Sequence, residues 1–186
     1  DFQIDDQVFT NNFKMTTLPP FKFQQLLRWM ADRGCTHAVV EVTSHAMDQS
    51  RLWGVSVDMA VFTNLTHDHL DYHDTEEEYV KAKGKLFGLL NFTKRKPGVP
   101  KISIINADDP RAPFFEQFVA DRTYLYGLRK GSYQALAPAC TASGSQFVLK
   151  VPNDQAEIDV APARFSCLCP TYLLIKFILF SEAAEL

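Results

Sequence analysis

The sequence predicts an α/β fold, in which a mostly parallel sheet is flanked by helices and followed by a small antiparallel β annex. From Thr16 to Tyr126, short continuous apolar runs alternate with stretches of helical periodicity. That repeated β-α-β order is typical of a parallel sheet with right-handed crossovers. From Tyr133 onward the pattern changes to short alternating runs between turn residues, which indicates antiparallel strands.

Composition narrows the class of protein. The chain has 186 residues, 46% of them hydrophobic, and a formal net charge of -3. These values describe a globular protein rather than a disordered or polyanion-binding one, so we expect no nucleic-acid partner. The four cysteines form no Cys-x-x-Cys pair, which favours a reducing, cytoplasmic setting.

Neither end of the sequence predicts a membrane partner. The first ten residues carry three aspartates where a signal peptide needs a basic region. The apolar run 172–180 is interrupted by Lys176 and is shorter than the ~20 residues of a membrane span. We therefore expect no membrane association.

The first elements are a short strand with a loop and then a helix. Residues 1–15 are polar and aperiodic. Thr16 to Pro20 has the composition of a helix start, and Gly34 is a typical stop. Between them, apolar residues at helical spacing predict an amphipathic helix; they are Phe23, Leu26, Leu27 and Met30.

Two buried strands are expected next. Residues 38–42 are continuous, apolar and rich in valine, and Glu41 interrupts them. A carboxylate within such a strand needs a partner or a cation, so Glu41 is a candidate functional group. Residues 44–51 read as a turn or short helix, and Met59–Thr63 reads as a second strand.

A polar cluster follows that second strand. Three of the five histidines, His67, His69 and His73, stand within ten residues of Asn64. The carboxyl end of a parallel strand is where ligands bind in α/β sheets, so the cluster predicts a site. The alternative is that Asp68, Asp71 and His73 only cap a turn before the next helix.

The remaining elements continue the alternation. Thr75 caps a helix that extends through Leu89, with acidic residues in its first turn. A third strand, 102–105, ends in Asn106-Ala-Asp-Asp109, and a phenylalanine-rich helix leads to a strand near 124–126. The antiparallel runs are 146–151 and 156–160.

Four of these segments carry a resemblance to a known family. They are Glu41-Val-Thr-Ser-His-Ala-Met-Asp-Gln49-Ser-Arg51, Val61-Phe-Thr-Asn64-Leu-Thr-His-Asp68-His69-Leu-Asp71-Tyr-His73, Tyr79 with Ala82-Lys83, and Asn106-Ala-Asp-Asp109. Together they resemble the central domain of the Mur ligases, in particular the tripeptide-synthetase branch that adds the third amino acid of the peptidoglycan stem. The resemblance covers roughly residues 14–127 and implies a P-loop-type fold.

The resemblance also implies site residues. Those that match binders of the UDP-N-acetylmuramoyl-dipeptide substrate are Thr16, Thr17, Thr43, Gln49 and Arg51. Glu41 and His69 match magnesium ligands, and Lys83 matches a lysine that the family carbamylates, which would let it join the metal site. Lys83 and His69 are the catalytic candidates. Asn106 and Asp109 match nucleotide-binding positions.

The implied cofactors are ATP and Mg²⁺, and the implied partners are the UDP-N-acetylmuramoyl-dipeptide and an amino acid. In the family's reaction the substrate carboxylate attacks the γ-phosphate, and an incoming amine displaces phosphate from the acyl phosphate to give an amide. Positioning and neutralisation of phosphate charge supply most of the catalysis.

The sequence departs from the family in two places. It contains no Gly-x-x-Gly-Lys-Thr phosphate loop, and after Arg164-Phe165 it continues into an unmatched apolar tail. We therefore expect residues 1–165 to be a partial central domain with its β annex at about 133–162, and residues 166–186 to be unrelated to it. We expect this fragment to be inactive alone.

Two alternative functions also fit parts of the sequence. The His67-x-His69-x-Asp71 spacing is similar to the metal motif of metallo-β-lactamase-type zinc hydrolases, although Tyr72 stands where that motif has histidine. This alternative leaves Glu41, Gln49, Arg51 and Lys83 without a role. The second alternative is a non-catalytic domain that binds a nucleotide-sugar without turnover.

Overall fold

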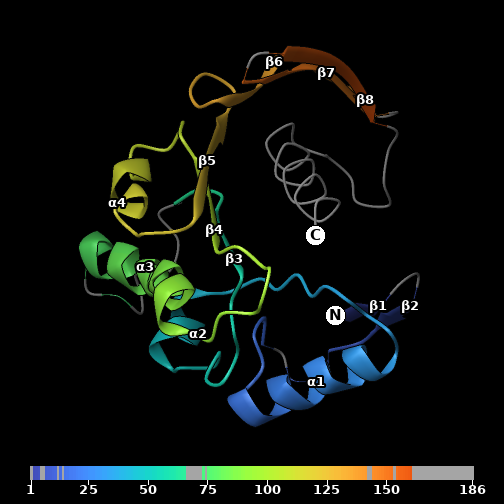
Figure 1. Cartoon of the computed structure of the whole chain (residues 1–186), viewed down its shortest axis with the longest axis vertical. Helices are drawn as coiled ribbons and strands as arrows, with labels where there is room; N and C mark the ends of the chain where they lie inside the picture. The colour runs from blue at the N-terminus through green and yellow to red at the C-terminus, as the bar shows by residue number, and fades with distance from the viewer. Residues whose placement is uncertain are drawn as a thin grey trace. The chain divides into compact units, whose positions relative to one another are not determined.

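A computed structural model describes residues 2–4, 7–11, 13, 15–65, 73, 75–141, 144–152 and 154–160. The chain divides into two compact units, one of residues 1–56 with 69–86 and one of residues 57–68 with 87–186. The helices and strands of both units are labelled in Figure 1. Most of the predicted polar cluster and the whole tail 166–186 lie outside the described residues.

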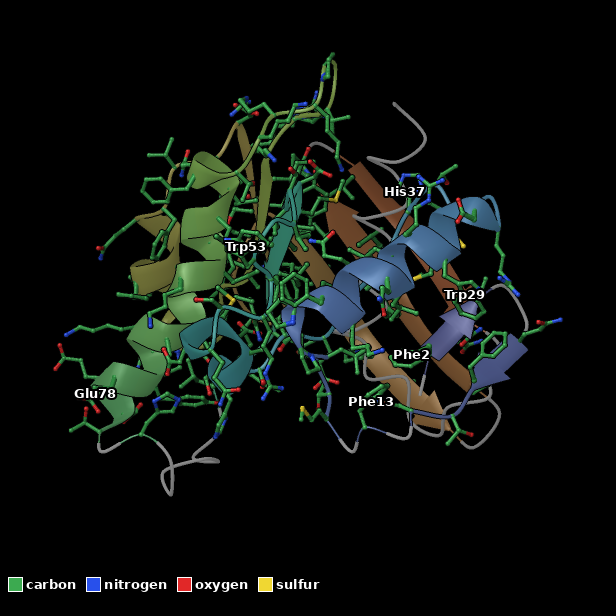
Figure 2. All side chains as sticks on the ribbon, turned by 90° about the horizontal axis from the view of Figure 1, so that it is seen from below. Phe2, Phe13, Trp29, His37, Trp53 and Glu78 are labelled. Carbon is green, nitrogen blue, oxygen red and sulfur yellow. The ribbon has the colours of Figure 1, made fainter. Side chains whose placement is uncertain are left out.

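The first unit contains a small hairpin and the predicted amphipathic helix. Strand β1 (Phe2–Ile4) pairs antiparallel with β2 (Gln7–Phe9). Helix α1 (Pro20–Asp32) confirms the prediction; it begins with proline at its first position and is followed by Gly34 at φ 85°. That backbone conformation favours glycine, because it has no Cβ. On α1, the ring of Trp29 lies edge-on to Phe9 at 4.9 Å between centroids, and Figure 2 shows Trp29 beside the hairpin.

Two more helices belong to this part of the chain. Helix α2 (Ser44–Asp48) forms where a turn or short helix was expected. Helix α3 (Glu76–Phe92) begins as predicted, with the Thr75 hydroxyl accepting a hydrogen bond of 3.2 Å from the Glu78 N–H. Residues 76–86 of α3 belong to the first unit, and residues 87–92 belong to the second.

The prediction of a strand at residues 38–42 is wrong. Residues 35–43 form neither helix nor strand, and Val39 is 87% exposed. An apolar, β-branched run becomes a strand only where a neighbouring backbone accepts and donates its hydrogen bonds. None of the described strands pairs with this segment, so its hydrophobic pattern alone does not produce a strand.

The second unit is built on one sheet of six strands among the described residues, in the order β3-β4-β5-β6-β7-β8. The first four strands pair in parallel and confirm the predicted β-α-β alternation. The last three pair antiparallel and form the predicted annex. The strands are β3 (Met59–Phe62), β4 (Ile102–Asn106), β5 (Arg122–Gly127), β6 (Tyr133–Thr141), β7 (Gly144–Val151) and β8 (Asp154–Val160).

Side chains from alternate strand positions make the core on the two faces of this sheet. One cluster of buried residues consists of Ile102, Ile104, Tyr126, Ala135, Phe147 and Leu149. It joins the parallel strands to the annex, since Tyr126 belongs to β5 and Leu149 to β7. The Tyr126 hydroxyl is satisfied by a 3.1 Å hydrogen bond to the Phe62 carbonyl.

Aromatic rings join the helices of this unit to the sheet. Phe115, on α4 (Ala112–Glu116), stacks on Phe62 of β3 at 3.9 Å between centroids and lies 5.1 Å from Phe87 of α3. Figure 1 shows α4 on one side of the strands β3–β5. In β6 the register shifts between Leu136 and Ala139, with Ala137 at φ 47°, which is a bulge.

Across the described residues, no helix has both the length and the apolar character to cross a bilayer.

Candidate functional site

The guanidinium group of Arg51 joins two of the predicted substrate-binding residues. It donates to the side-chain oxygen of Gln49 from Nε at 3.0 Å and from Nη2 at 2.6 Å. Its Nη1 donates to the backbone carbonyl of Thr17 at 2.6 Å. A planar guanidinium can serve several acceptors in this fixed fork geometry. The structure thus brings together Thr17, Gln49 and Arg51, although Thr17 and Arg51 are 34 positions apart in the sequence.

The turn after α2 places Gln49 and Arg51. Gln49 caps the helix, and Ser50 adopts the left-handed conformation at φ 51°. The Ser50 N–H bonds to the Met47 carbonyl at 3.1 Å and the Arg51 N–H to the Ala46 carbonyl at 2.8 Å. This pair of hydrogen bonds is the Schellman motif that commonly ends helices. Arg51 is therefore held through its backbone as well as its side chain.

Thr17 extends the network to the segment that carries Glu41. Its hydroxyl donates to the Glu41 backbone carbonyl at 2.9 Å, and its side chain is buried. Thr43, two residues on, is the N-cap of α2 and accepts a 3.2 Å hydrogen bond from the Ala46 N–H. Thr16 is exposed beside Thr17. All five predicted substrate-binding residues thus belong to the first unit.

The expected metal site is only partly described. The Glu41 side chain is exposed, while Lys83 is half-buried on α3 with its Nζ 5.1 Å from the ring centroid of Tyr79. His69 lies outside the described residues. No group of three His, Cys, Asp or Glu side chains that could hold a metal ion occurs in the part of the chain that the structure describes. The roles of Glu41, His69 and Lys83 therefore stay predictions.

A second set of charged groups links α2 to α3. Asp48, next to Gln49, forms an ion pair with Lys85, which is two residues from Lys83. Its other oxygen lies 3.9 Å from Nδ1 of the buried His73. Nothing in the local sequence marks Asp48 or Lys85, because an ion pair between residues 37 positions apart leaves no local signal. Asp48 connects the turn that carries Gln49 to the helix that carries Lys83.

In the second unit, Asn106 and Asp109 follow β4 at the carboxyl edge of the parallel strands. Asn106 donates from Nδ2 to the Thr63 carbonyl at 2.7 Å. Asp109 accepts from the Leu65 N–H at 2.9 Å and from the Arg111 N–H at 2.8 Å. Both residues therefore organise the loops at this edge, which is the position where ligands bind in open α/β sheets.

A model of the Mur ligase middle domain matches residues 3–163. The chain belongs to the Mur ligase family.

Relatives and a solved structure agree with this membership. The Mur ligase chain described here is 40% identical over 147 residues to the UDP-N-acetylmuramoyl-L-alanyl-D-glutamate--2,6-diaminopimelate ligase of Geobacillus kaustophilus, covering 77% of this chain and 29% of that protein. It is 42% identical over 120 residues to the UDP-N-acetylmuramyl-tripeptide synthetase of a Roseiflexus species, covering 62% of this chain and 24% of that protein. This chain thus spans less than a third of these curated relatives.

The fold of this Mur ligase chain matches that of a solved relative. A structure of a UDP-N-acetylmuramoyl-L-alanyl-D-glutamate--2,6-diaminopimelate ligase aligns with a TM-score of 0.73 and 27% identity. The alignment covers 92% of this chain and 34% of that one. The predicted fold class is confirmed by this match together with the sheet order.

Proposed function

We propose that this chain supplies substrate- and nucleotide-binding groups of an ATP-dependent ligase that adds the third amino acid to UDP-N-acetylmuramoyl-dipeptide in peptidoglycan synthesis. Its family and the names of its relatives support that reaction. The observation that carries the proposal is the Arg51 network, because it joins residues that the resemblance assigns to one substrate. The compartment proposed for this reaction is the cytoplasm.

Arg51 retains donors for the substrate. A guanidinium has five N–H groups, and the hydrogen bonds to Gln49 and Thr17 use three of them. The remaining two can bind a phosphate or carboxylate oxygen, and Arg51 is only half-buried. Thr16, Thr17, Thr43 and Gln49 complete the proposed substrate set with hydroxyl and amide groups.

The proposed magnesium ligands fit the ion by their chemistry. Mg²⁺ prefers oxygen ligands, and the exposed carboxylate of Glu41 is accessible to one, since only the backbone oxygen of that residue is bound by Thr17. A carbamate on Lys83 would add two more oxygens, and His69 would add an imidazole nitrogen. When bound, the ion would neutralise phosphate charge.

We further propose that the nucleotide is ATP and that it binds near Asn106 and Asp109, after β4. The 186 residues contain no Gly-x-x-Gly-Lys-Thr loop to hold its phosphates. We therefore expect nucleotide binding by this chain to be weak and ligation by this chain alone to be absent. Residues 1–165 are proposed to be the part of the middle domain present here, with residues 166–186 outside it.

Calorimetric titration of the purified chain with UDP-N-acetylmuramoyl-dipeptide tests the proposal. We expect saturable binding that Arg51→Ala weakens by about tenfold or more, because charge-assisted hydrogen bonds to the ligand are lost. The matched control is Arg28→Ala, which removes an exposed arginine whose ion pair with Asp32 lies within α1. Absence of binding, or equal loss in both variants, would contradict the proposal.

A second candidate function is binding of the nucleotide-sugar without turnover, which needs only the substrate-binding groups around Arg51. Both candidates predict binding of the dipeptide substrate. They differ at Lys83, since only a ligase has use for a carbamate beside magnesium. The family that matches residues 3–163 is a ligase family, which argues against the zinc-hydrolase alternative.

A further inference from the structure

The carboxylate of Asp108 holds the turn that follows β5. It accepts hydrogen bonds from three consecutive backbone N–H groups: Leu128 at 2.6 Å, Lys130 at 2.9 Å and Arg129 at 3.2 Å to each oxygen. Successive N–H groups that converge in this way form an anion-binding nest. The nest therefore offsets the negative charge of Asp108 within the protein itself.

Two glycines of this turn lie so close to neighbouring atoms that a larger residue would displace the backbone. A Cβ on Gly127 would lie 2.6 Å from the Lys130 carbonyl oxygen and 2.9 Å from the Asp108 carboxylate. Gly131 has φ 100°, and a Cβ there would lie 2.6 Å from the Leu125 carbonyl oxygen. Only glycine fits both positions without a shift of backbone. The backbone conformation of the turn at 127–131 is thus determined by close contacts within the fold.

The turn stands at the edge where the nucleotide is proposed to bind. Strands β4 and β5 are parallel, with Asn106 opposite Tyr126, so they end together. The Ala107 N–H bonds to the Tyr126 carbonyl at 2.7 Å, and Asp108 follows at once. Residues 106–109 therefore connect to the loop after β3 through Asn106 and Asp109, and to the turn after β5 through Asp108.

The turn adds two positive charges to that edge. Arg129 and Lys130 are both exposed, and within the described residues neither forms an ion pair. Their backbone N–H groups are bound by Asp108, which leaves their side chains as the groups that can reach a ligand. A nucleotide polyphosphate is the complementary ligand, because arginine and lysine both bind phosphate.

We propose that the 127–131 turn is a phosphate-contacting element, in which Arg129 and Lys130 bind a nucleotide phosphate and Asp108 is the residue that positions them. The inference rests on the proposed function, since it places the nucleotide at this edge. Asp108 does not touch the nucleotide and acts only through the turn.

Two measurements on the full 186-residue chain test the inference. The first is titration with ADP in the presence of Mg²⁺. Replacing both cations, Arg129→Ala with Lys130→Ala, is expected to weaken binding by about tenfold, which is the loss of roughly one charge-assisted hydrogen bond. The matched control, Lys94→Ala with Lys150→Ala, removes the same charge from exposed positions of the same unit and is expected to leave the affinity unchanged.

The second measurement follows backbone hydrogen exchange in Asp108→Ala. The amides of residues 128–130 are expected to exchange at least about tenfold faster, while those of β4 and β5 keep their protection. Asp108→Ala should also weaken ADP binding, but it should add nothing once Arg129 and Lys130 are both alanine. That non-additivity separates a positioning residue from one that only stabilises the fold.

The results distinguish a failure of the phosphate contact from a failure of the proposed nucleotide binding. If the wild-type chain binds ADP and the cation variant binds it equally well, the inference is overturned while the proposed function stands. If the wild-type chain does not bind ADP, the nucleotide part of the proposed function fails and the contact with phosphate fails with it. Unchanged exchange at 128–130 in Asp108→Ala refutes the positioning role in either case.

Discussion

Nη1 of Arg51 lies 2.6 Å from the backbone carbonyl oxygen of Thr17. This hydrogen bond connects the turn that follows α2 to the segment that precedes α1. Thr17 is buried, so its carbonyl has few other partners to replace the guanidinium. The same guanidinium orients Gln49. Arg51 therefore has a structural task and a proposed binding task, and substitutions must be chosen to separate them.

Arg51→Lys separates the two tasks. Lysine keeps the positive charge but cannot serve Gln49 and Thr17 in the same planar geometry. We expect the free energy of unfolding to fall by about 1–2 kcal/mol, because one buried acceptor loses its donor. Urea denaturation checks this loss. An unchanged midpoint would show that the network seen around Arg51 contributes nothing to stability.

Carbamylation of Lys83 can be observed directly. With ¹³C-labelled bicarbonate, the wild-type chain is expected to show a carbamate carbon signal by NMR that Lys83→Arg lacks, since a guanidinium does not form a carbamate. Lys81→Arg is the control, because Lys81 is exposed and paired with Glu77 on the same helix. A wild-type spectrum without the signal would favour the non-catalytic binding function.

Lys101 is expected to be essential for stability. Its side chain is 1% exposed and donates to the carbonyls of Val57 and Lys94 and to the Asp58 carboxylate. Lys101→Met keeps most of the volume but removes the buried ammonium that these acceptors share, at a cost of about 2–4 kcal/mol.

Chemical denaturation measures the cost at Lys101. The control, Lys94→Met, changes an exposed lysine and should stay within about 0.5 kcal/mol of wild type. Equal effects of the two substitutions would mean that the buried ammonium is replaceable.

The Asp121 carboxyl is expected to make the stability of the fold depend on pH in the acid range. The backbone N–H of Lys101, followed by the guanidinium of Arg95, holds the pKa of the Asp121 carboxyl below its usual value. A carboxyl whose pKa is lower in the folded state adds stability above its unfolded pKa of about 3.9, and that stability is lost as pH falls through the folded pKa. We expect the unfolding temperature of wild type to fall more steeply than that of Asp121→Asn below about pH 4. Thermal scans at fixed ionic strength check this, and parallel curves would contradict it.

Local patterns in the sequence were sufficient for most of the elements. Helical spacing from Phe23 to Met30 predicted α1, and short apolar runs predicted β3, β4 and β5. The run at 38–42 has the same character and forms no strand, since nothing among the described strands pairs with it. The hydrophobic pattern indicates which residues are expected to be buried in a strand-like run. A strand also needs a neighbouring strand whose backbone pairs with it through hydrogen bonds.

At the candidate site too, the sequence predicted some features and only the structure revealed others. Its residue types came from the order of motifs along the chain, which also carried the family resemblance. The contacts came from residues far apart in the sequence: Arg51 with Thr17, Asp48 with Lys85, and Asp108 with residues 128–130. No local signal marks such pairs, and none marks Lys101 as a buried residue.

The sequence by itself determined the period of most helices and strands, the family, and the kinds of groups offered to a ligand, because these depend on near neighbours and on residue chemistry. Only the tertiary structure decided which carbonyl each cation satisfies and which turn each carboxylate holds. Those choices depend on distances of about 3 Å between atoms that folding alone brings together.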